Sequence, residues 1–326
     1  MHQIFWSTQT QLYYTNFIRN LMKNVRLLNS LMAIAIAAFV FSCQQRETNP
    51  TNPNAITDEI KDQFRSLGFD PSDIRYIKQS NSITNEVKEG YLLEKDMFIT
   101  KANFEAMLTS DSKSGVNGEQ YRTNNLVQRL PRTIRVVGYT GGSGTISVSV
   151  DADNVNDGRA SVGALSNRMR TGLQWAINNF NNINTGLNFQ LSFSSNTSGA
   201  DIIVFQEFNG EDGGIAEFPS RGNPGRIVRL FSGMNSYNNN VNEHVATHEI
   251  GHTLGLRHTD FFNRTISCGR GGNEGSGSAG AIHIPGTGTT NNASGFDFNS
   301  IMLACFSSNS QGEFSAQDRT ALEFLY

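Results

Sequence analysis

One short segment holds the residues best suited to chemistry: His248-Glu249-Ile250-Gly251-His252-Thr253-Leu254-Gly255-Leu256-Arg257-His258. His248 and His252 are four residues apart, so a helix places both imidazoles on one face, about one turn apart. Gly255 can adopt a left-handed conformation and turn the chain, which lets His258 supply a third nitrogen. Three histidines leave one position of a tetrahedral zinc ion open, which is typical of a catalytic site rather than a structural one.

Glu249 follows the first ligand and is predicted to be the catalytic base, because its carboxylate lies near the metal without binding it. Zinc lowers the pKa of a bound water, so Glu249 can accept a proton from it and pass that proton to the leaving amine. This predicts that Glu249 is necessary for turnover and dispensable for zinc binding. The competing interpretation is a helix with histidines on a polar face, which Gly255 and His258 argue against.

The same segment resembles the zinc-binding motif of the metzincin clan of metallopeptidases. Within that clan, His-Glu-Ile-Gly-His looks most like the dual-action HEIGH metallopeptidases of bacteria. Asn299-Ser300-Ile301-Met302 resembles the Met-turn, which carries a methionine beneath the zinc ligands, although Met302 could also be an ordinary buried methionine. Thr259 and the lack of a tyrosine two residues after Met302 depart from better-known families. The resemblance therefore leaves oxyanion stabilisation mainly to zinc.

This resemblance implies an α+β fold, a metzincin-like zincin catalytic domain preceded by a small pro-segment. Its parts would be a twisted mixed sheet, a long backing helix, the active-site helix, the Met-turn and a C-terminal helix. Hydrophobic periodicity agrees, since it predicts helices over 161–180, 242–254 and 315–325. Alternating residues predict strands over 133–139, 145–150, 187–193, 201–206, 214–218 and 226–231. In metzincins, the strand that corresponds to 214–218 is an edge strand that binds substrate as an added strand.

Residues 1–43 are predicted to be an export signal rather than part of the fold. Basic residues precede an apolar run of about 15 residues, which is short for a membrane span of roughly 20. Met22 looks like the natural start of this signal. Val40-Phe41-Ser42-Cys43 resembles a bacterial lipoprotein box, which implies a lipid on Cys43; a plain signal peptide is the alternative. Either way the protein is expected to be exported, as an outer-membrane or cell-surface lipoprotein or as a secreted protein.

The cysteine count leads to a second expectation. The chain has 3 cysteines, so lipidation of Cys43 would leave the pair Cys268 and Cys305. In an exported protein such a pair is expected to form a disulfide, and two free buried thiols are the alternative.

The N-terminal half divides into a flexible tether over 44–55 and a predicted pro-segment over 56–130, followed by the catalytic domain over 131–326. Leu93-Glu94-Lys95-Asp96-Met97 resembles the pro-segment motif of astacins, whose aspartate occupies the open zinc position. The resemblance implies that Asp96 is an inhibitory ligand, and a solvated turn charge is the alternative.

Two further expectations concern loops. Cleavage near Arg129 or Arg132 could release the catalytic domain. The oxygen-rich stretch from Glu207 to Gly214 could hold calcium, but it lacks an EF-hand pattern, and a solvated loop is the alternative.

The formal net charge of -3 gives no reason to expect a nucleic-acid partner. A protein or peptide substrate is the expected partner, and the chain is expected to be a monomer. Two other functions stay open: a surface lipoprotein that binds another protein and keeps a vestigial zinc site, and a zinc hydrolase of non-peptide amides. The presence of Glu249 argues against a vestigial site, because such a site needs no base.

Overall fold

The computed structural model describes residues 56–67, 69, 71–93, 97–109, 120–150, 158–271, 282–288 and 296–326. All of them lie within one compact unit, Asn52–Tyr326. Among these residues, no helix combines the length and the apolar character needed to cross a membrane.

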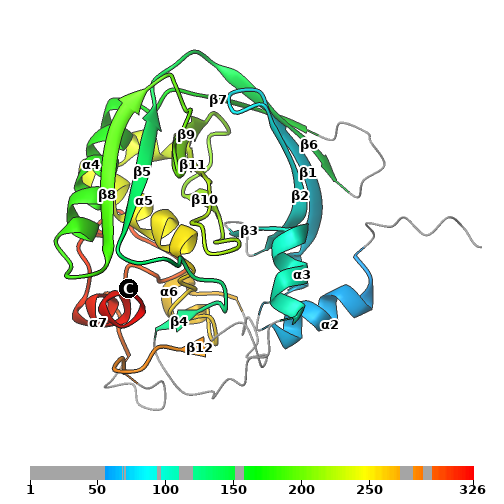
Figure 1. The fold of residues 1–326 in the computed structure, drawn as a ribbon, viewed down its shortest axis with the longest axis vertical. Helices are drawn as coiled ribbons and strands as arrows, with labels where there is room; N and C mark the ends of the chain where they lie inside the picture. Colours follow the sequence, from blue (N-terminus) through cyan, green and yellow to red (C-terminus); the bar gives the residue numbers. More distant parts are fainter. Residues whose placement is uncertain are drawn as a thin grey trace, which may run out of the picture. The chain divides into compact units, whose positions relative to one another are not determined.

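Along the described chain, runs of consecutive strands are separated by single helices or short groups of helices (Figure 1). The strands are β1 (Arg75–Asn81), β2 (Glu86–Leu93), β3 (Met97–Thr100), β4 (Tyr121–Arg122), β5 (Arg132–Tyr139), β6 (Gly144–Val150), β7 (Gly158–Gly163), β8 (Leu187–Ser194), β9 (Ile202–Glu207), β10 (Gly214–Glu217), β11 (Ile227–Phe231) and β12 (Ile282–His283). The helices are α2 (Asp58–Ser66), α3 (Lys101–Thr109), α4 (Asn167–Asn181), α5 (Asn239–Leu254), α6 (Thr265–Cys268) and α7 (Ala316–Leu325), with short 3-10 turns at Pro71–Asp73 and Ser232–Ser236.

The main sheet closes on itself, so the predicted fold class is wrong. Eight strands follow one another in the order β11-β10-β3-β2-β1-β6-β7-β9, and β9 pairs with β11 to complete the ring. Pairing is mixed, since β9–β11 and β3–β10 are parallel whereas β1–β2 and β1–β6 are antiparallel. Strands β5 and β8 extend the sheet beyond β9. The structure is thus a closed mixed sheet with few helices, not an α+β fold with an open twisted sheet and a backing helix.

The closure depends on strands that the sequence analysis assigned to a separate pro-segment. Strand β1 pairs with β6, and β3 pairs with β10, so 75–100 and the later strands share one sheet (Figure 1). Alternation of side chains indicates a strand but carries no information about its partner, which is why the sequence did not reveal the closed ring. The boundary near residue 131 stays a prediction.

Strands β2 and β3 pair antiparallel, with Leu93 opposite Met97. One local prediction changes. Helix α4 begins at Asn167 rather than at 161, because Ser166 caps it and accepts a hydrogen bond from the Met169 amide.

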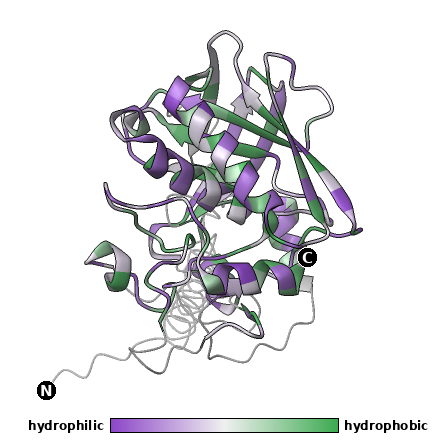
Figure 2. Ribbon diagram, turned by 90° about the vertical axis from the view of Figure 1, so that its left-hand side faces the viewer, coloured by the Kyte–Doolittle hydropathy of each residue, from purple (hydrophilic) through white to green (hydrophobic). Residues whose placement is uncertain are grey.

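Helix α4 buries one face against α5 and β8. Its buried residues recur at helical spacing, and they join a core cluster that also contains Val245, Ile250, Leu254 and Met302. Figure 2 shows the side of the molecule on which α4 lies in Figure 1, where the helices carry both hydrophilic and hydrophobic segments. The metal helix α5 is therefore held from one side by apolar packing.

A second core lies between α2, α3 and strands β1 to β3. It is rich in aromatic rings: Phe64 stacks on Phe104 at 4.1 Å between centroids and meets Tyr91 edge-on at 4.8 Å. We call this set the aromatic cluster; its buried members are Phe64, Leu67, Phe69, Ile74, Tyr76, Tyr91, Leu93, Met97, Ile99, Phe104, Met107 and Phe218.

Candidate metal centre

Helix α5 presents the first two predicted ligands. Asn238 caps its first turn by accepting a hydrogen bond from the Val241 amide at 3.0 Å. The helix is buried along almost its whole length, and the rings of His248 and His252 lie 4.6 Å apart between centroids. This is the arrangement that the four-residue spacing predicted.

The third ligand reaches the site because the helix ends sharply. Gly255 has φ 105° and ψ 9°, the left-handed conformation predicted for it. A Cβ atom there would also lie 2.5 Å from the Asn125 carbonyl oxygen, so strain and lack of space both require glycine. The turn returns the chain beneath the helix, and the His258 ring lies 5.0 Å from that of His252 and 5.3 Å from that of His248.

One nitrogen of each histidine can reach a common point. The three ligand atoms lie within 4.8 Å of one another, and the three residues form the one group of His, Cys, Asp or Glu side chains among the described residues that could hold a metal. Nδ1 of His248 contacts the Ile301 carbonyl oxygen at 2.8 Å, and Nδ1 of His252 contacts that of Leu256 at 2.8 Å. Since a carbonyl only accepts, each Nδ1 carries the proton, and each Nε2 keeps a lone pair for a metal.

The pKa shifts of His248 and His252 agree with neutral rings that offer a nitrogen to a metal. Burial, assisted by the neighbouring His258, holds the pKa of His248 well below its ordinary value. Burial and the nearby His248 do the same for His252. The Nε2 atom of His252 is buried and has no hydrogen-bond partner among the described residues. Two histidines held in the neutral form and a buried Nε2 atom on His252 fit a zinc ion, which binds imidazole nitrogens at about 2.0–2.1 Å.

Glu249 lies against the backbone of β10. A Cβ atom on Gly214 would lie 2.9 Å from both Cγ and Oε1 of Glu249, so the side chain needs glycine opposite it. Glu249 is 2% exposed and lines the same cleft as His248. That cleft has a volume of about 1160 Å³ and is the space in which a substrate can meet the predicted base.

Met302 lies where the predicted Met-turn would place it. It is 1% exposed, and its carbonyl oxygen accepts a hydrogen bond from the Thr259 amide at 2.7 Å. A Cβ atom on Gly251 would lie 2.6 Å from the Met302 sulfur. The glycine within His-Glu-Ile-Gly-His therefore makes room for this methionine beneath the helix.

A buried polar network under the site was not found from the sequence. Asp318 of α7 accepts hydrogen bonds from Ser300 Oγ and Gln120 Nε2 at 2.8 Å each, and from the Ile301 amide at 2.9 Å. Ser300 Oγ also contacts Thr259 Oγ1 at 2.6 Å. We call Gln120, Thr259, Ser300 and Asp318 the polar floor. It fixes the peptide of Ile301, whose carbonyl orients His248.

The polar floor had only one sequence signal. Ser315 and Asp318 form a capping box at the start of α7, and the spacing of these two residues indicates a helix start only. Gln120 lies within the predicted pro-segment, far from the motif. Beside it, the Thr123 amide donates to the Gly255 carbonyl oxygen at 2.9 Å, and the Arg257 amide donates to that of Tyr121. Residues 120–123 therefore belong to the structure that holds the metal loop.

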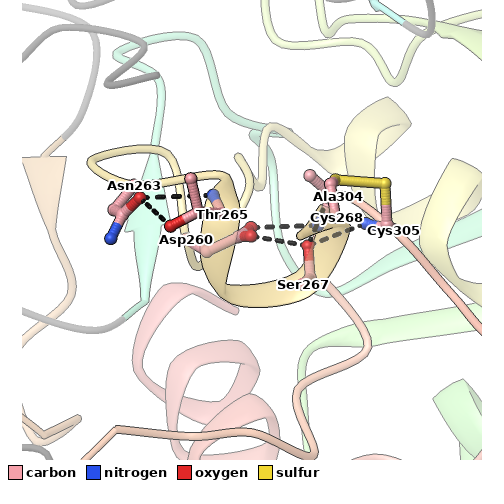
Figure 3. The surroundings of a disulfide bond; sticks show 7 residues. All are labelled: Asp260, Asn263, Thr265, Ser267, Cys268, Ala304 and Cys305. Carbon is pink, nitrogen blue, oxygen red and sulfur yellow. Dashed lines mark hydrogen bonds between the residues drawn. A yellow bond between two sulfur atoms is a disulfide. The ribbon is translucent and has the colours of Figure 1, made fainter. Parts of the chain in front are cut away.

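The predicted disulfide between Cys268 and Cys305 is present. Figure 3 shows how it joins the loop after His258 to the chain after Met302. Asp260 accepts hydrogen bonds from Ser267 Oγ at 2.6 Å and from the Ala304 amide at 3.0 Å, while Ser267 Oγ accepts one from the Cys305 amide at 3.0 Å. Both cysteines line the cleft, so these bonds fix one of its walls.

Other predicted features are placed differently or not at all. Cys43 and Asp96 lie outside the described residues. Strand β10 is not an edge strand, because β11 pairs with one side of it and β3 with the other. This corrects the expectation that 214–218 offers a free edge to substrate.

In the loop considered for calcium, the oxygens already have partners. Glu207 pairs with Arg229 at 2.9 Å, the Asn209 side-chain oxygen accepts the Glu211 amide, and Asp212 accepts the Tyr237 hydroxyl. Nothing in these contacts supports a calcium site.

With this geometry established, comparison with known proteins is informative. Residues 91–326 match the family model of the dual-action HEIGH metallopeptidases. The chain belongs to this family. The match covers helix α5, Met302, the polar floor and strand β3, so it begins well before residue 131. A search of curated proteins finds no match.

Two solved structures of myroilysin match this HEIGH metallopeptidase at low sequence identity. One shows 15% identity and a TM-score of 0.36, and covers 62% of this chain and 96% of that one. A second shows 16% identity and a TM-score of 0.32, with coverages of 66% and 92%. Membership of the family thus makes the chain a metallopeptidase that acts on protein or peptide substrates.

Proposed function

We propose that the protein is a zinc-dependent endopeptidase of the metzincin type, with His248, His252 and His258 as ligands and Glu249 as the general base. The observation that supports this most strongly is the convergence of three histidine nitrogens within 4.8 Å beside a buried glutamate in an open cleft. A bound zinc ion would supply a Lewis acid that acidifies a water molecule and polarises the substrate carbonyl.

The residues of the chain perform the remaining steps. Glu249 accepts the proton of the attacking water and delivers it to the nitrogen of the scissile bond as that bond breaks. The close approach of Gly214 keeps the carboxylate on the cleft side of α5. The Ile301 and Leu256 carbonyls hold His248 and His252 in the tautomer that binds metal.

A latent form is part of the proposal. Its support is the pairing of β3 with β10, which occupies the strand edge that an extended substrate would need. Lys88 of β2 also contacts both carboxylate oxygens of Glu217 in β10 at 2.7 and 2.8 Å. Activation would then displace β3. Because residues 120–123 hold the loop that carries His258, an activating cleavage that leaves this loop intact would fall before Gln120 rather than near Arg129 or Arg132. If Asp96 is also an inhibitory ligand, Asp96→Ala will shorten the latent phase before casein cleavage begins.

Export and lipid attachment through Cys43 are proposed on the sequence alone. The test is fractionation of cells that express the full chain or its Cys43→Ser variant. Retention of the full chain in the membrane fraction and release of the variant are expected. Equal behaviour of the two would remove the lipid anchor from the proposal.

The decisive experiment compares the full chain with Glu249→Gln, with the zinc content measured for both, before and after limited proteolysis. One zinc per chain in both proteins, with casein cleavage in the unmutated one alone, is expected. Zinc in both without activity in either would support a binding module with a vestigial site. Folded protein that takes up no zinc would overturn the ligand assignment.

A further inference from the structure

A second hollow lies on the other side of the metal helix and shares no lining residue with the cleft. It has a volume of about 500 Å³, within the range of roughly 300–1,000 Å³ typical of ligand sites. One wall is a stripe of α4 at helical spacing, formed by Trp175, Asn178 and Asn182. The other wall comes from the start of α5 and from 311–313, and includes Glu243 and Glu313. We call this hollow the acidic groove.

The charges in the acidic groove all have one sign. Glu243 and Glu313 are both acidic, and none of the residues that line the groove is basic. Glu243 is 5% exposed; its Oε1 accepts a hydrogen bond from Asn179 at 2.8 Å, and its second oxygen has no hydrogen-bond partner among the described residues. Burial and the nearby Glu313 raise the pKa of Glu243 to about 7. A buried carboxylate with an unused oxygen is stabilised by a cation.

Trp175 distinguishes between kinds of cation. It is 38% exposed on the groove wall, although a large aromatic side chain is normally buried. The face of an indole ring attracts an ammonium or guanidinium group, and such a contact adds to pairing with carboxylates. A metal ion could use the carboxylate and amide oxygens of the groove but would gain nothing from the ring. The combination therefore fits an organic cation, as found on a lysine or arginine side chain.

We propose that the acidic groove is an exosite that binds a lysine or arginine side chain of a protein substrate. The cationic ligand follows from the groove itself, and its assignment to a substrate rests on the proposed peptidase function. Position supports that assignment: Glu243 is adjacent to His244, whose ring lines the active cleft. Nδ1 of His244 contacts the carbonyl oxygen of Gln311 at 2.8 Å, and the Gln311 side chain belongs to the groove. A basic segment held there lies one helix away from the metal.

Binding can be measured without cleavage. The full chain carrying Glu249→Gln is titrated with a fluorescein-labelled Gly-Lys-Gly-Lys-Gly peptide and with the same peptide carrying norleucine in place of lysine. Trp175→Ala and Glu313→Gln change exposed residues, so the fold should be kept, and circular dichroism checks this. Glu323→Gln removes the same charge from the exposed side of α7 and is the matched control. Each groove variant is expected to weaken lysine-peptide binding about fivefold or more, with the control unchanged.

Several results would overturn the exosite. These are equal affinity for the lysine and norleucine peptides, unchanged binding in the Trp175→Ala/Glu313→Gln double variant, or no binding at millimolar peptide. Stabilisation by calcium that Glu313→Gln abolishes, without peptide binding, would make the groove a metal site instead. If the peptide binds as expected but the unmutated chain cleaves nothing, the acidic groove is a cation-binding site and the proposed peptidase function is wrong. In an active enzyme, the groove variants should raise KM for lysine-rich substrates and leave kcat unchanged.

Discussion

The metal centre and the aromatic cluster are held together in different ways. The metal centre depends on directed hydrogen bonds: the Ile301 carbonyl orients His248, and Asp318 fixes the peptide of Ile301. The aromatic cluster depends on ring packing, with Phe64 in contact distance of Phe69, Tyr91 and Phe104. Hydrogen bonds fix positions to a fraction of an ångström, whereas apolar burial is non-directional. One region therefore fixes the positions of the candidate metal ligands, while the other contributes mainly to stability.

The two regions meet directly at Phe218 of the aromatic cluster, whose ring lies 5.2 Å from that of His252. Arg257, which precedes the third histidine, lies over the Phe69 ring at 4.1 Å. The ladder between β3 and β10 is a third junction, and the Asn103 side chain adds a hydrogen bond to the Pro219 carbonyl oxygen at 2.6 Å. The predictions below test whether stability and metal geometry can be changed separately.

The largest effect is expected at the centre of the aromatic cluster. Phe64→Ala removes a fully buried ring that contacts three others, and should lower the free energy of unfolding by about 3–5 kcal/mol. Thermal unfolding followed by circular dichroism measures this. Phe324→Ala, at a ring that is 55% exposed, is the control and should change little. A large loss of zinc affinity in Phe64→Ala, in addition to the loss of stability, would contradict the separation of the two regions.

A smaller but more localised effect is expected in the polar floor. The two carboxylate oxygens of Asp318 both accept hydrogen bonds, one from Ser300 Oγ and the other from the Ile301 amide. Asp318→Asn replaces one of these oxygens with an amide group that donates, and should weaken zinc binding about 10- to 100-fold. Competition with a chelator measures the affinity. Glu323→Gln on the same helix controls for the loss of charge. Unchanged zinc affinity in Asp318→Asn would show that the Ile301 carbonyl is held in place without the polar floor.

The same contrast explains what the sequence could predict. The three histidines and Gly255 lie in the arrangement that local spacing indicated, because a helix and its terminating glycine are determined by neighbouring residues. The disulfide followed from a count of cysteines. Gln120 could not be predicted, because its partners Ser300 and Asp318 are more than 150 residues away and no local pattern links them.

The fold class was wrong for a related physical reason. The six predicted strands correspond to β5, β6, β8, β9, β10 and β11, but the ring also needs β1, β2, β3 and β7, which are not among these six. The ring closes through β1–β6 and β3–β10, whose partners are set by tertiary packing rather than by alternation. The aromatic cluster contributes to this closure, since Phe218 follows β10 and packs with residues from β1 to β3. The family resemblance, carried by the metal motif and by short segments at Met302 and Asp96, held no information about which strands pair with the N-terminal ones.

The smallest effects are expected from two helix caps, one in each region. Ser315 caps α7 and Thr57 caps α2, and each accepts one hydrogen bond from a backbone amide of the first turn. Alanine at either position should lower the free energy of unfolding by about 0.5–2 kcal/mol. The two should differ in their effect on the metal, because the Ser315 amide also donates to Asp318 at 3.0 Å and its hydroxyl donates to Asp297.

Ser315→Ala and Thr57→Ala should therefore lower the free energy of unfolding by similar amounts but differ in their effect on zinc binding. Ser315→Ala should weaken zinc binding measurably in the chelator assay, since movement of Asp318 is transmitted through Ile301 to His248. Thr57→Ala should leave the zinc affinity unchanged, because the aromatic cluster is the one described hydrophobic core on which α2 packs. Ser315→Thr, which keeps the hydroxyl, should restore affinity. Equal zinc affinity in both alanine variants would mean that the polar floor tolerates a loosened α7, and that the division between the two regions is weaker than their contacts indicate.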